Sequence, residues 1–306
     1  MLRVLTVCPH CSAGCGLYLL VDGGDVIGVM PAAGHPVSRG SLCMKGWTSF
    51  QHLRHPERLE SPLMRMNGGL EAVPWEQALA RVAEGLETVK SRHGGGAVGF
   101  LASGRTTNEE LLLIDRIASA GFGTKAIGFD AWSHPLHHVP AILVEGPRVG
   151  RLDEIQAADL LLVFDPGLAD HHPQVASRVL RAMEQGRKSV VLSPRRDILA
   201  ERATLRVEGW SPEGVAAALR GGGGTSNEPL GQLWREAERP LLIYPLKSLP
   251  LLREADLLLA FEHLVEKSGA RVLLLFPRAN SRGAFHRRKG RGVSDIRGIK
   301  ARMVRE

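Results

Sequence analysis

The sequence predicts an α/β protein in which a small β-rich N-terminal domain precedes two Rossmann-like lobes with parallel sheets. Two observations predict this fold class. All four cysteines lie within the first 43 of 306 residues, which sets the N-terminal domain chemically apart. From about residue 70, short apolar runs alternate with segments whose apolar residues recur at helical spacing, as in an α/β layer. No apolar stretch reaches the roughly 18 residues that a membrane span needs.

Three short apolar segments predict β-strands within residues 1–58. Leu2–Val7 leads into the loop that holds the first cysteines. Leu17–Val21 and Val26–Met30 flank Asp-Gly-Gly-Asp, a typical hairpin turn. Leu2–Val7 is too short for the core of a signal peptide, so we expect a cytoplasmic location.

The cysteines follow the spacing C-x2-C-x3-C-x27-C and are Cys8, Cys11, Cys15 and Cys43. Three thiolates from one tight loop and a fourth from a second loop suit a [4Fe–4S] cluster. A structural zinc site also takes four thiolates, but it favours two C-x2–4-C pairs. A disulfide framework needs an oxidising compartment, which nothing else in the chain suggests. The spacing therefore favours one [4Fe–4S] cluster, with zinc and disulfides as alternatives.

Helix and strand patterns alternate along the remaining chain. Trp75–His93 is a predicted amphipathic helix, followed by a strand at Ala97–Leu101 and a helix at Glu110–Ala120. Later apolar runs are nearly continuous, as in central parallel strands. The later predicted strands are Ala158–Phe164, Lys188–Leu192, Leu205–Val207, Pro240–Tyr244 and Ala270–Phe276, and the later helices are His172–Gln185, Ser211–Leu219 and Leu249–Lys267.

We expect four segments in the domain organisation. Residues 1–58 form the cysteine domain, residues 59–130 and 225–285 one α/β lobe, and residues 131–224 an inserted lobe. Gly221–Gly224 is a predicted flexible linker, at the point where the chain passes from one lobe to the other. Residues 286–306 are a predicted basic, flexible tail.

The net charge of +7 is concentrated near the C-terminal end. From Arg278 to Glu306 there are ten Lys or Arg and two acidic residues. The segment lacks the interleaved aromatic residues of many nucleic-acid binders, so we expect no nucleic-acid partner. It favours an arm that docks on an acidic partner surface.

Several motifs, in the same order along the chain, resemble the molybdopterin-guanine-dinucleotide oxidoreductases. This family includes formate dehydrogenase large subunits, periplasmic nitrate reductases and the large iron–sulfur subunit of respiratory complex I. The resemblance implies an iron–sulfur domain followed by α/β lobes that bind a pterin nucleotide. The matching segments are Cys43–Gly46 (C-x-K-G), Arg58–Leu63 (R-L-x-x-P-L), Val73–Leu79 (x-x-W-x-x-A-L), Ala158–Phe164 with His172-Pro173 (A-D-x-I-L-V-x-G-x-N…H-P), Ser193–Arg196 (D-P-R) and Pro277–Ala284 (N-x-x-G-A).

The chain also departs from the family pattern. Family enzymes ligate molybdenum or tungsten with Cys, selenocysteine or Ser, often in C-H-S-P, whereas Trp132 stands at that position here. The family's G-x-N becomes Asp165-Pro166-Gly167, which places negative charge near the expected nucleotide phosphates. We also expect no C-terminal cap domain. The resemblance thus implies no catalytic metal ligand, and it disfavours bound molybdopterin guanine dinucleotide.

Two further groups of residues are candidates for function. In the family, the lysine matching Lys45 lies between cluster and pterin, so Lys45 is expected to tune the cluster or lie on the electron path. Five histidines near predicted strand ends could bind a metal, but a polar rim of the ancestral cofactor crevice is favoured. They are His134, His137, His138, His171 and His172.

Three functions follow from these observations. The favoured one is an iron–sulfur electron-transfer subunit on a degenerate molybdopterin oxidoreductase scaffold, docking a flavin, hydrogenase or dehydrogenase partner and not catalytic by itself. The alternative is a pterin-binding, formate dehydrogenase-like subunit completed by a partner chain. The least favoured is a structural zinc interaction module.

Overall fold

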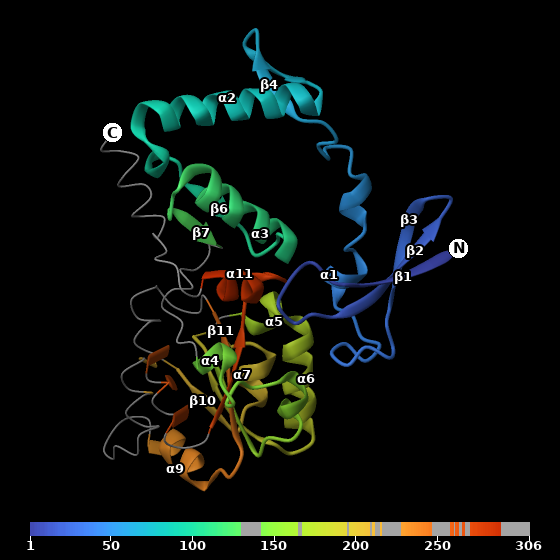
Figure 1. Ribbon diagram of the computed structural model, residues 1–306. Helices are drawn as coiled ribbons and strands as arrows, with labels where there is room; N and C mark the ends of the chain where they lie inside the picture. The colour runs from blue at the N-terminus through green and yellow to red at the C-terminus, as the bar shows by residue number, and fades with distance from the viewer. Residues whose placement is uncertain are drawn as a thin grey trace.

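The computed structural model in Figure 1 describes most of the chain in continuous stretches. These are residues 1–129, 142–164, 167–194, 196–208, 210–211, 228–246 and 270–288, with positions 215, 258–259, 261–262 and 265–266 between them.

The N-terminal domain contains a three-stranded antiparallel sheet in the order β1-β2-β3. Its strands are β1 (Leu2–Val7), β2 (Gly16–Asp22) and β3 (Asp25–Pro31). The turn between β2 and β3 uses Gly23 and Gly24 with φ of 58° and 90°, a left-handed backbone that glycine adopts without steric cost. The predicted hairpin is therefore present. Two short helices follow, α1 (Met44–Trp47) and the 3-10 turn η1 (Gln51–Arg54).

Residues 59–129 form a small α/β lobe. An antiparallel hairpin leads into the 19-residue helix α2, and a parallel strand pair, β6 and β7, flanks α3. Helix α3 begins two residues earlier than expected because Thr107 and Glu110 form a reciprocal capping box. The bounds are β4 (Leu63–Met66), β5 (Gly69–Ala72), α2 (Trp75–His93), η2 (Gly95–Ala97), β6 (Phe100–Ala102), α3 (Asn108–Arg116), the π-helical turn η3 (Ile117–Gly121) and β7 (Ile127–Phe129).

The largest sheet in the described part of the chain is a five-stranded parallel sheet in the order β10-β9-β8-β11-β12. Each strand lies where an apolar run predicted one, so this part of the fold prediction is confirmed. The strands are β8 (Leu160–Phe164), β9 (Lys188–Leu192), β10 (Leu205–Val207), β11 (Pro240–Pro245) and β12 (Arg271–Leu275).

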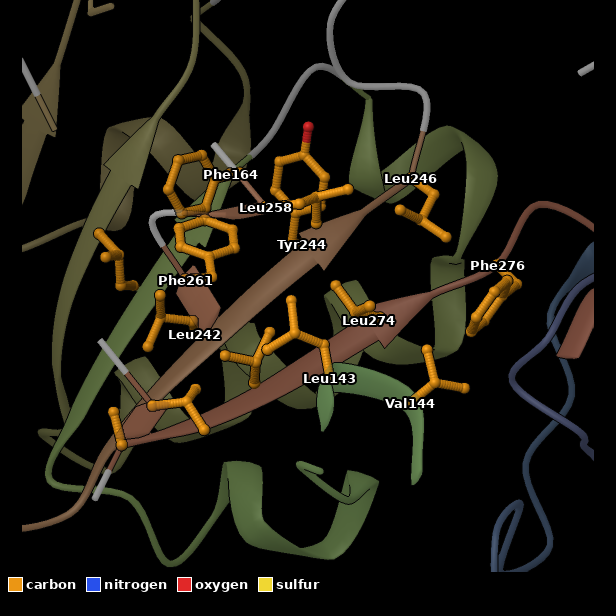
Figure 2. Packing of buried hydrophobic residues seen from close by; sticks show 14 of the residues in the cluster. Leu143, Val144, Phe164, Leu242, Tyr244, Leu246, Leu258, Phe261, Leu274 and Phe276 are labelled. Carbon is orange, nitrogen blue, oxygen red and sulfur yellow. The ribbon is translucent and has the colours of Figure 1, made fainter. Parts of the chain in front are cut away.

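Both faces of this sheet are buried, which explains why its strands lack alternating polar residues. All five residues of β8 are almost fully buried. On one face, the rings of Phe164, Tyr244 and Phe261 meet edge to face with centroids 5.2–5.5 Å apart (Figure 2). Such geometry is the preferred one for aromatic pairs.

Short helices connect and cover the strands. Helix α6 begins with a proline at its first position, where the missing N–H costs no hydrogen bond. The described helical segments are α4 (Ile142–Glu145), η5 (Leu152–Ile155), α5 (Leu168–His171), α6 (Pro173–Glu184), α7 (Ile198–Arg202), α9 (Glu228–Glu236) and α11 (Ser281–Arg288).

The sheet differs from the predicted division into lobes. That division assigned β11 and β12 to the lobe of residues 59–130 and β8–β10 to an inserted lobe. In the structure β11 pairs directly with β8, with Leu241 beside Leu161 and Ile243 beside Val163. Apolar periodicity marks a buried strand but carries no information on its neighbour, which is why the sequence did not reveal this pairing.

Other predictions fall partly or wholly outside the described residues. The first three residues of the predicted tail, 286–288, continue helix α11, so the tail prediction is corrected there. Residues 289–306, the linker Gly221–Gly224 and Trp132 lie outside the described residues, as do most of the predicted helices Ser211–Leu219 and Leu249–Lys267.

Candidate functional site

Two loops bring the four cysteines to one cavity, here called the cysteine cavity. The first loop leaves β1 and turns at Gly14, whose φ of 69° favours glycine. The N–H of Cys8 donates to the carbonyl of Cys15 across the base of this loop, at 2.8 Å. The second loop ends at Cys43, directly before α1. The cavity is lined by Cys8, His10, Cys11, Gly14, Cys15, Leu42, Cys43, Lys45, Gly46, Pro173 and Gln174.

The thiols are free and largely shielded from water. Cys8 and Cys15 are each 6% exposed, and Cys11 and Cys43 are half-buried. Burial, and next the neighbouring thiols, raise the pKa of Cys15 to about 12. Burial likewise raises the pKa of Cys8 and Cys11, while the charge of Lys45 acts in the opposite direction on both. A cationic metal centre would offset this cost by stabilising the thiolates.

The spacing of this donor set, three thiols from one loop and one from a second, is typical of an iron–sulfur cluster. A zinc ion holds four sulfurs at about 2.3 Å, so its thiolates converge on one point. The thiolates of a [4Fe–4S] cluster bind separate irons and surround a larger group. Four free thiols that line one cavity suit that arrangement.

The cysteine loop is anchored to the end of the parallel sheet. Ser12 Oγ accepts a hydrogen bond from the N–H of Phe276 at 2.8 Å, and the N–H of Ser12 donates to the Phe276 carbonyl at 3.4 Å. Arg178 on α6 donates to the carbonyls of Val37 and Leu152, which ties the second loop to the same body. These bonds hold the cysteine cavity at the carboxyl end of β12.

Lys45 connects the cysteine cavity to a second pocket. Its Nζ donates to the carbonyl of Asp170 at 2.5 Å, and its side chain lines both spaces. Lys45 therefore lies beside the cysteine cavity. Its role as a tuning charge or electron path remains a prediction.

The second pocket lies where the order of the parallel strands reverses, between β8 and β11. We call it the switch-point pocket. In open α/β sheets, ligands bind in this crevice, outside the carboxyl ends of the strands. Its volume is about 350 Å³, within the range of small-molecule sites. It is lined by His10, Cys11, Lys45, Arg105, Gly167, His171, His172, Pro245, Leu246, Pro277 and Arg278.

Positive charge dominates this pocket. Lys45, Arg105 and Arg278 line it, and no carboxylate is among the described residues that line it. Burial and the nearby charges of Arg105 and Lys45 lower the pKa of His10. Sequence reasoning missed His10, Arg105 and Arg278 as site residues. Only Arg278, two residues beyond a predicted strand, carried a positional signal.

His172 is the buried polar side chain of the switch-point pocket, only 2% exposed. Its Nε2 lies 3.0 Å from the carbonyl oxygen of Phe276, whereas its Nδ1 has no partner within the described part of the chain. The Nε2 of His10 is also buried and without a partner. Burial lowers the pKa of His172 to about 4, so the ring is neutral near pH 7. Two histidines that line the pocket therefore each have a ring nitrogen without a hydrogen bond to the described residues.

The structure tests only part of the predicted histidine group. His171 and His172 line the switch-point pocket, as expected for a polar rim at the strand ends. His134, His137 and His138 lie outside the described residues, together with Trp132 and Asp165. Whether all five histidines meet is therefore still a prediction.

Comparison with protein families defines the class of this chain. Residues 1–55 match the molybdopterin oxidoreductase Fe4S4 domain, and residues 58–221 match the molybdopterin oxidoreductase domain. Together these matches include the cysteine cavity and strands β8–β10 of the parallel sheet. The chain therefore belongs to the molybdopterin oxidoreductase family, and the family predicted from its motifs is confirmed.

Curated relatives include formate dehydrogenases. The F420-dependent formate dehydrogenase subunit alpha of Methanocaldococcus jannaschii is 33% identical over 208 residues, which are 67% of this chain and 30% of the relative. Formate dehydrogenase H of Escherichia coli is 33% identical over 220 residues, 68% of this chain and 30% of the relative. The chain thus spans about a third of the length of these relatives.

Solved structures share the fold at low sequence identity. Acetylene hydratase from Pelobacter acetylenicus matches with a TM-score of 0.61 and 18% identity, covering 98% of this chain and 38% of that one. A chain of the formyltransferase/hydrolase complex from Methylorubrum extorquens matches with a TM-score of 0.54 and 15% identity, covering 76% of this chain and 71% of that one.

No described helix is long and apolar enough to cross a membrane.

Proposed function

We propose that the chain is an iron–sulfur electron-transfer subunit of a redox complex. One observation carries this proposal: four free thiols, from loops 28 residues apart in sequence, line the same cavity. Cys8, Cys11, Cys15 and Cys43 would hold one [4Fe–4S] cluster, which supplies one-electron transfer when bound. The match to the Fe4S4 domain supports the cofactor. The four ligands are our assignment.

The surroundings of the cavity support a role in electron transfer. Lys45 places a cation beside an anionic group and so favours its reduced, more negative form. The Ser12–Phe276 bonds fix the loop on the sheet, so few groups need to move when the charge changes. Partners of flavin, hydrogenase or dehydrogenase type fit the formate dehydrogenase relatives, one of which is named as a subunit.

The test is spectroscopy of the full chain purified without oxygen. We expect about four irons per chain and an S = 1/2 EPR signal after reduction, because four thiolates complete one cluster. Cys43→Ala removes one ligand and should diminish both iron content and signal. Ser41→Ala, two residues away in the same loop, is the matched control and should retain them. Stoichiometric zinc without iron would contradict the proposal.

A second candidate function is binding of a pterin nucleotide, as in a formate dehydrogenase-like subunit. The switch-point pocket favours it, because three cations and two histidines with an unpartnered ring nitrogen are among the described residues that line it. Lys45, Arg105 and Arg278 would hold the anionic part of the group, which supplies a metal site for oxidoreduction when bound. Trp132 at the usual metal-ligand position weighs against catalysis by this chain alone.

Analysis of molybdenum, tungsten and fluorescent pterin products separates the two candidates. The chain is purified from a host that makes the cofactor. We expect iron but no stoichiometric molybdenum or tungsten, because Trp132 offers no thiolate or hydroxyl ligand. Stoichiometric metal with formate-dependent dye reduction would instead favour the second candidate.

A further inference from the structure

The hydrogen bonds of His172 fix which of its ring nitrogens carries the proton. The carbonyl of Phe276 can only accept a hydrogen bond, so the Nε2 that lies 3.0 Å from it must carry the hydrogen. A neutral imidazole has one N–H, so Nδ1 is left with a lone pair. The burial that keeps the ring neutral therefore also makes Nδ1 a hydrogen-bond acceptor.

The lone pair of Nδ1 has no partner among the described residues. Leaving a buried polar atom unpaired destabilises the folded chain, so such atoms commonly mark the place of a ligand or water. His172 lines the switch-point pocket together with Lys45, Arg105 and Arg278, whose positive charge attracts an anion. The pocket thus combines an acceptor at one point with positive charge at others.

We propose that His172 determines the ligand specificity of the switch-point pocket. Its Nδ1 accepts a hydrogen bond from an N–H or O–H group on the body of an organic phosphate, while Lys45 and Arg105 attract the phosphate. This inference rests on the second candidate function, since it requires that the pocket hold a phosphate-bearing molecule. It adds that the body of that molecule must donate a hydrogen bond.

His172 also belongs to the anchor of the cysteine loop. Its Nε2–H and the N–H of Ser12 meet at the same carbonyl oxygen, that of Phe276. Replacing the imidazole with an apolar group would remove this bond and disturb the cysteine cavity as well. His172→Gln avoids the problem, because the Gln amide can still donate from the position of Nε2 and lacks the acceptor at the position of Nδ1.

The experiment measures the affinity of two probes for the full chain by calorimetry. Guanosine monophosphate carries N–H and O–H donors on its body, whereas phenyl phosphate carries none. His172→Gln should weaken binding of guanosine monophosphate about five- to tenfold, the value of one hydrogen bond, and leave phenyl phosphate unchanged. His93→Gln, an exposed histidine at the end of α2, is the matched control and should change neither affinity.

The possible outcomes separate this inference from the second candidate function. An equal loss of affinity for both probes in His172→Gln would show a general structural effect and would overturn the specificity role. Unchanged binding of both would overturn it as well, while leaving an organic-phosphate pocket in place. If the wild-type chain binds neither probe, the result contradicts both the second candidate function and this inference. The iron–sulfur proposal is judged separately, by its EPR signal.

Discussion

Lys45 shows how one charged residue can influence two neighbouring spaces. It lines the cysteine cavity and the switch-point pocket, and a backbone carbonyl of α5 holds its ammonium group. A fixed cation beside a cluster stabilises the reduced state more than the oxidised one. The residue therefore links the candidate electron-transfer centre to the candidate ligand site.

We expect Lys45→Met to lower the midpoint potential of the cluster. A partly screened interaction of about 1 kcal/mol corresponds to roughly 40 mV for one electron. The measurement is an EPR-monitored redox titration of wild type and variant. Lys90→Met, on the distant helix α2, serves as a control for the loss of one positive charge. An unchanged midpoint in Lys45→Met would indicate a role in packing or docking instead.

His172 should make stability depend on pH. Burial depresses its pKa from the usual 6.5 to about 4, so the folded chain resists protonation more than the unfolded chain does. Its contribution is therefore complete above pH 6.5 and is lost as the pH falls toward 4. The loss is at most about 3 kcal/mol. Denaturant unfolding of wild type between pH 4 and 7 should show this decline.

The His172→Gln variant isolates that contribution, because Gln does not titrate in this range. Its free energy of unfolding should depend less on pH than that of wild type between pH 4 and 6.5. His93→Gln should follow wild type, since that histidine is exposed. Parallel pH dependence in wild type and His172→Gln would mean that His172 has an ordinary pKa in the folded chain.

The secondary-structure elements differ sharply in how much of their apolar surface they bury. Strand β8 lies in the middle of the sheet and is buried on both faces. Helix α2 has the apolar spacing of an amphipathic helix, yet none of its residues is buried, and Leu79 is 59% exposed. Figure 1 shows α2 apart from the parallel sheet, on the far side of β6, β7 and α3.

The same substitution in these two elements should therefore have different effects on stability. Leu162→Ala in β8 removes buried methyl groups and should cost about 2–5 kcal/mol in the free energy of unfolding. Leu79→Ala in α2 should stay within about 0.5 kcal/mol, because the side chain is already in water. Denaturant unfolding of both variants checks this. Equal losses would mean that the face of α2 containing Leu79 is covered in solution.

On the scale of the whole molecule, charge is distributed unevenly. The net charge is +7, and residues 289–306 carry six Lys or Arg and two acids, so their removal leaves +3. The switch-point pocket adds local positive potential next to the cysteine cavity. Long-range fields of this kind accelerate encounter with partners of opposite charge, and salt screens them.

Oxidation of the reduced cluster by an anionic acceptor, such as ferricyanide, should therefore slow as ionic strength rises. A cationic viologen acceptor should show the opposite or no dependence. A chain lacking residues 289–306 should have a smaller salt dependence with the anionic acceptor, because its net charge is lower. Stopped-flow kinetics at low and high salt measure this. Identical salt dependence in both chains would leave residues 289–306 without a steering role.

The sequence by itself determined the local features of this protein. The spacing of Cys8, Cys11, Cys15 and Cys43 predicted an iron–sulfur domain, and the family match confirmed such a domain. Apolar runs predicted all five strands of the parallel sheet, and the Asp-Gly-Gly-Asp turn predicted the first hairpin. The turn and the strands depend on neighbouring residues, and the ligand spacing can be read directly from the order of the cysteines along the chain.

Only the tertiary structure decided which distant residues meet. It placed β11 beside β8, contrary to the predicted lobes, and so created the crevice that His10, Arg105 and Arg278 line. It also gave the two nitrogens of His172 different environments. Leu241 and Leu161 pair across 80 positions of the chain, and His172 meets Phe276 across 104. The pattern of residues along the chain does not encode such distant contacts.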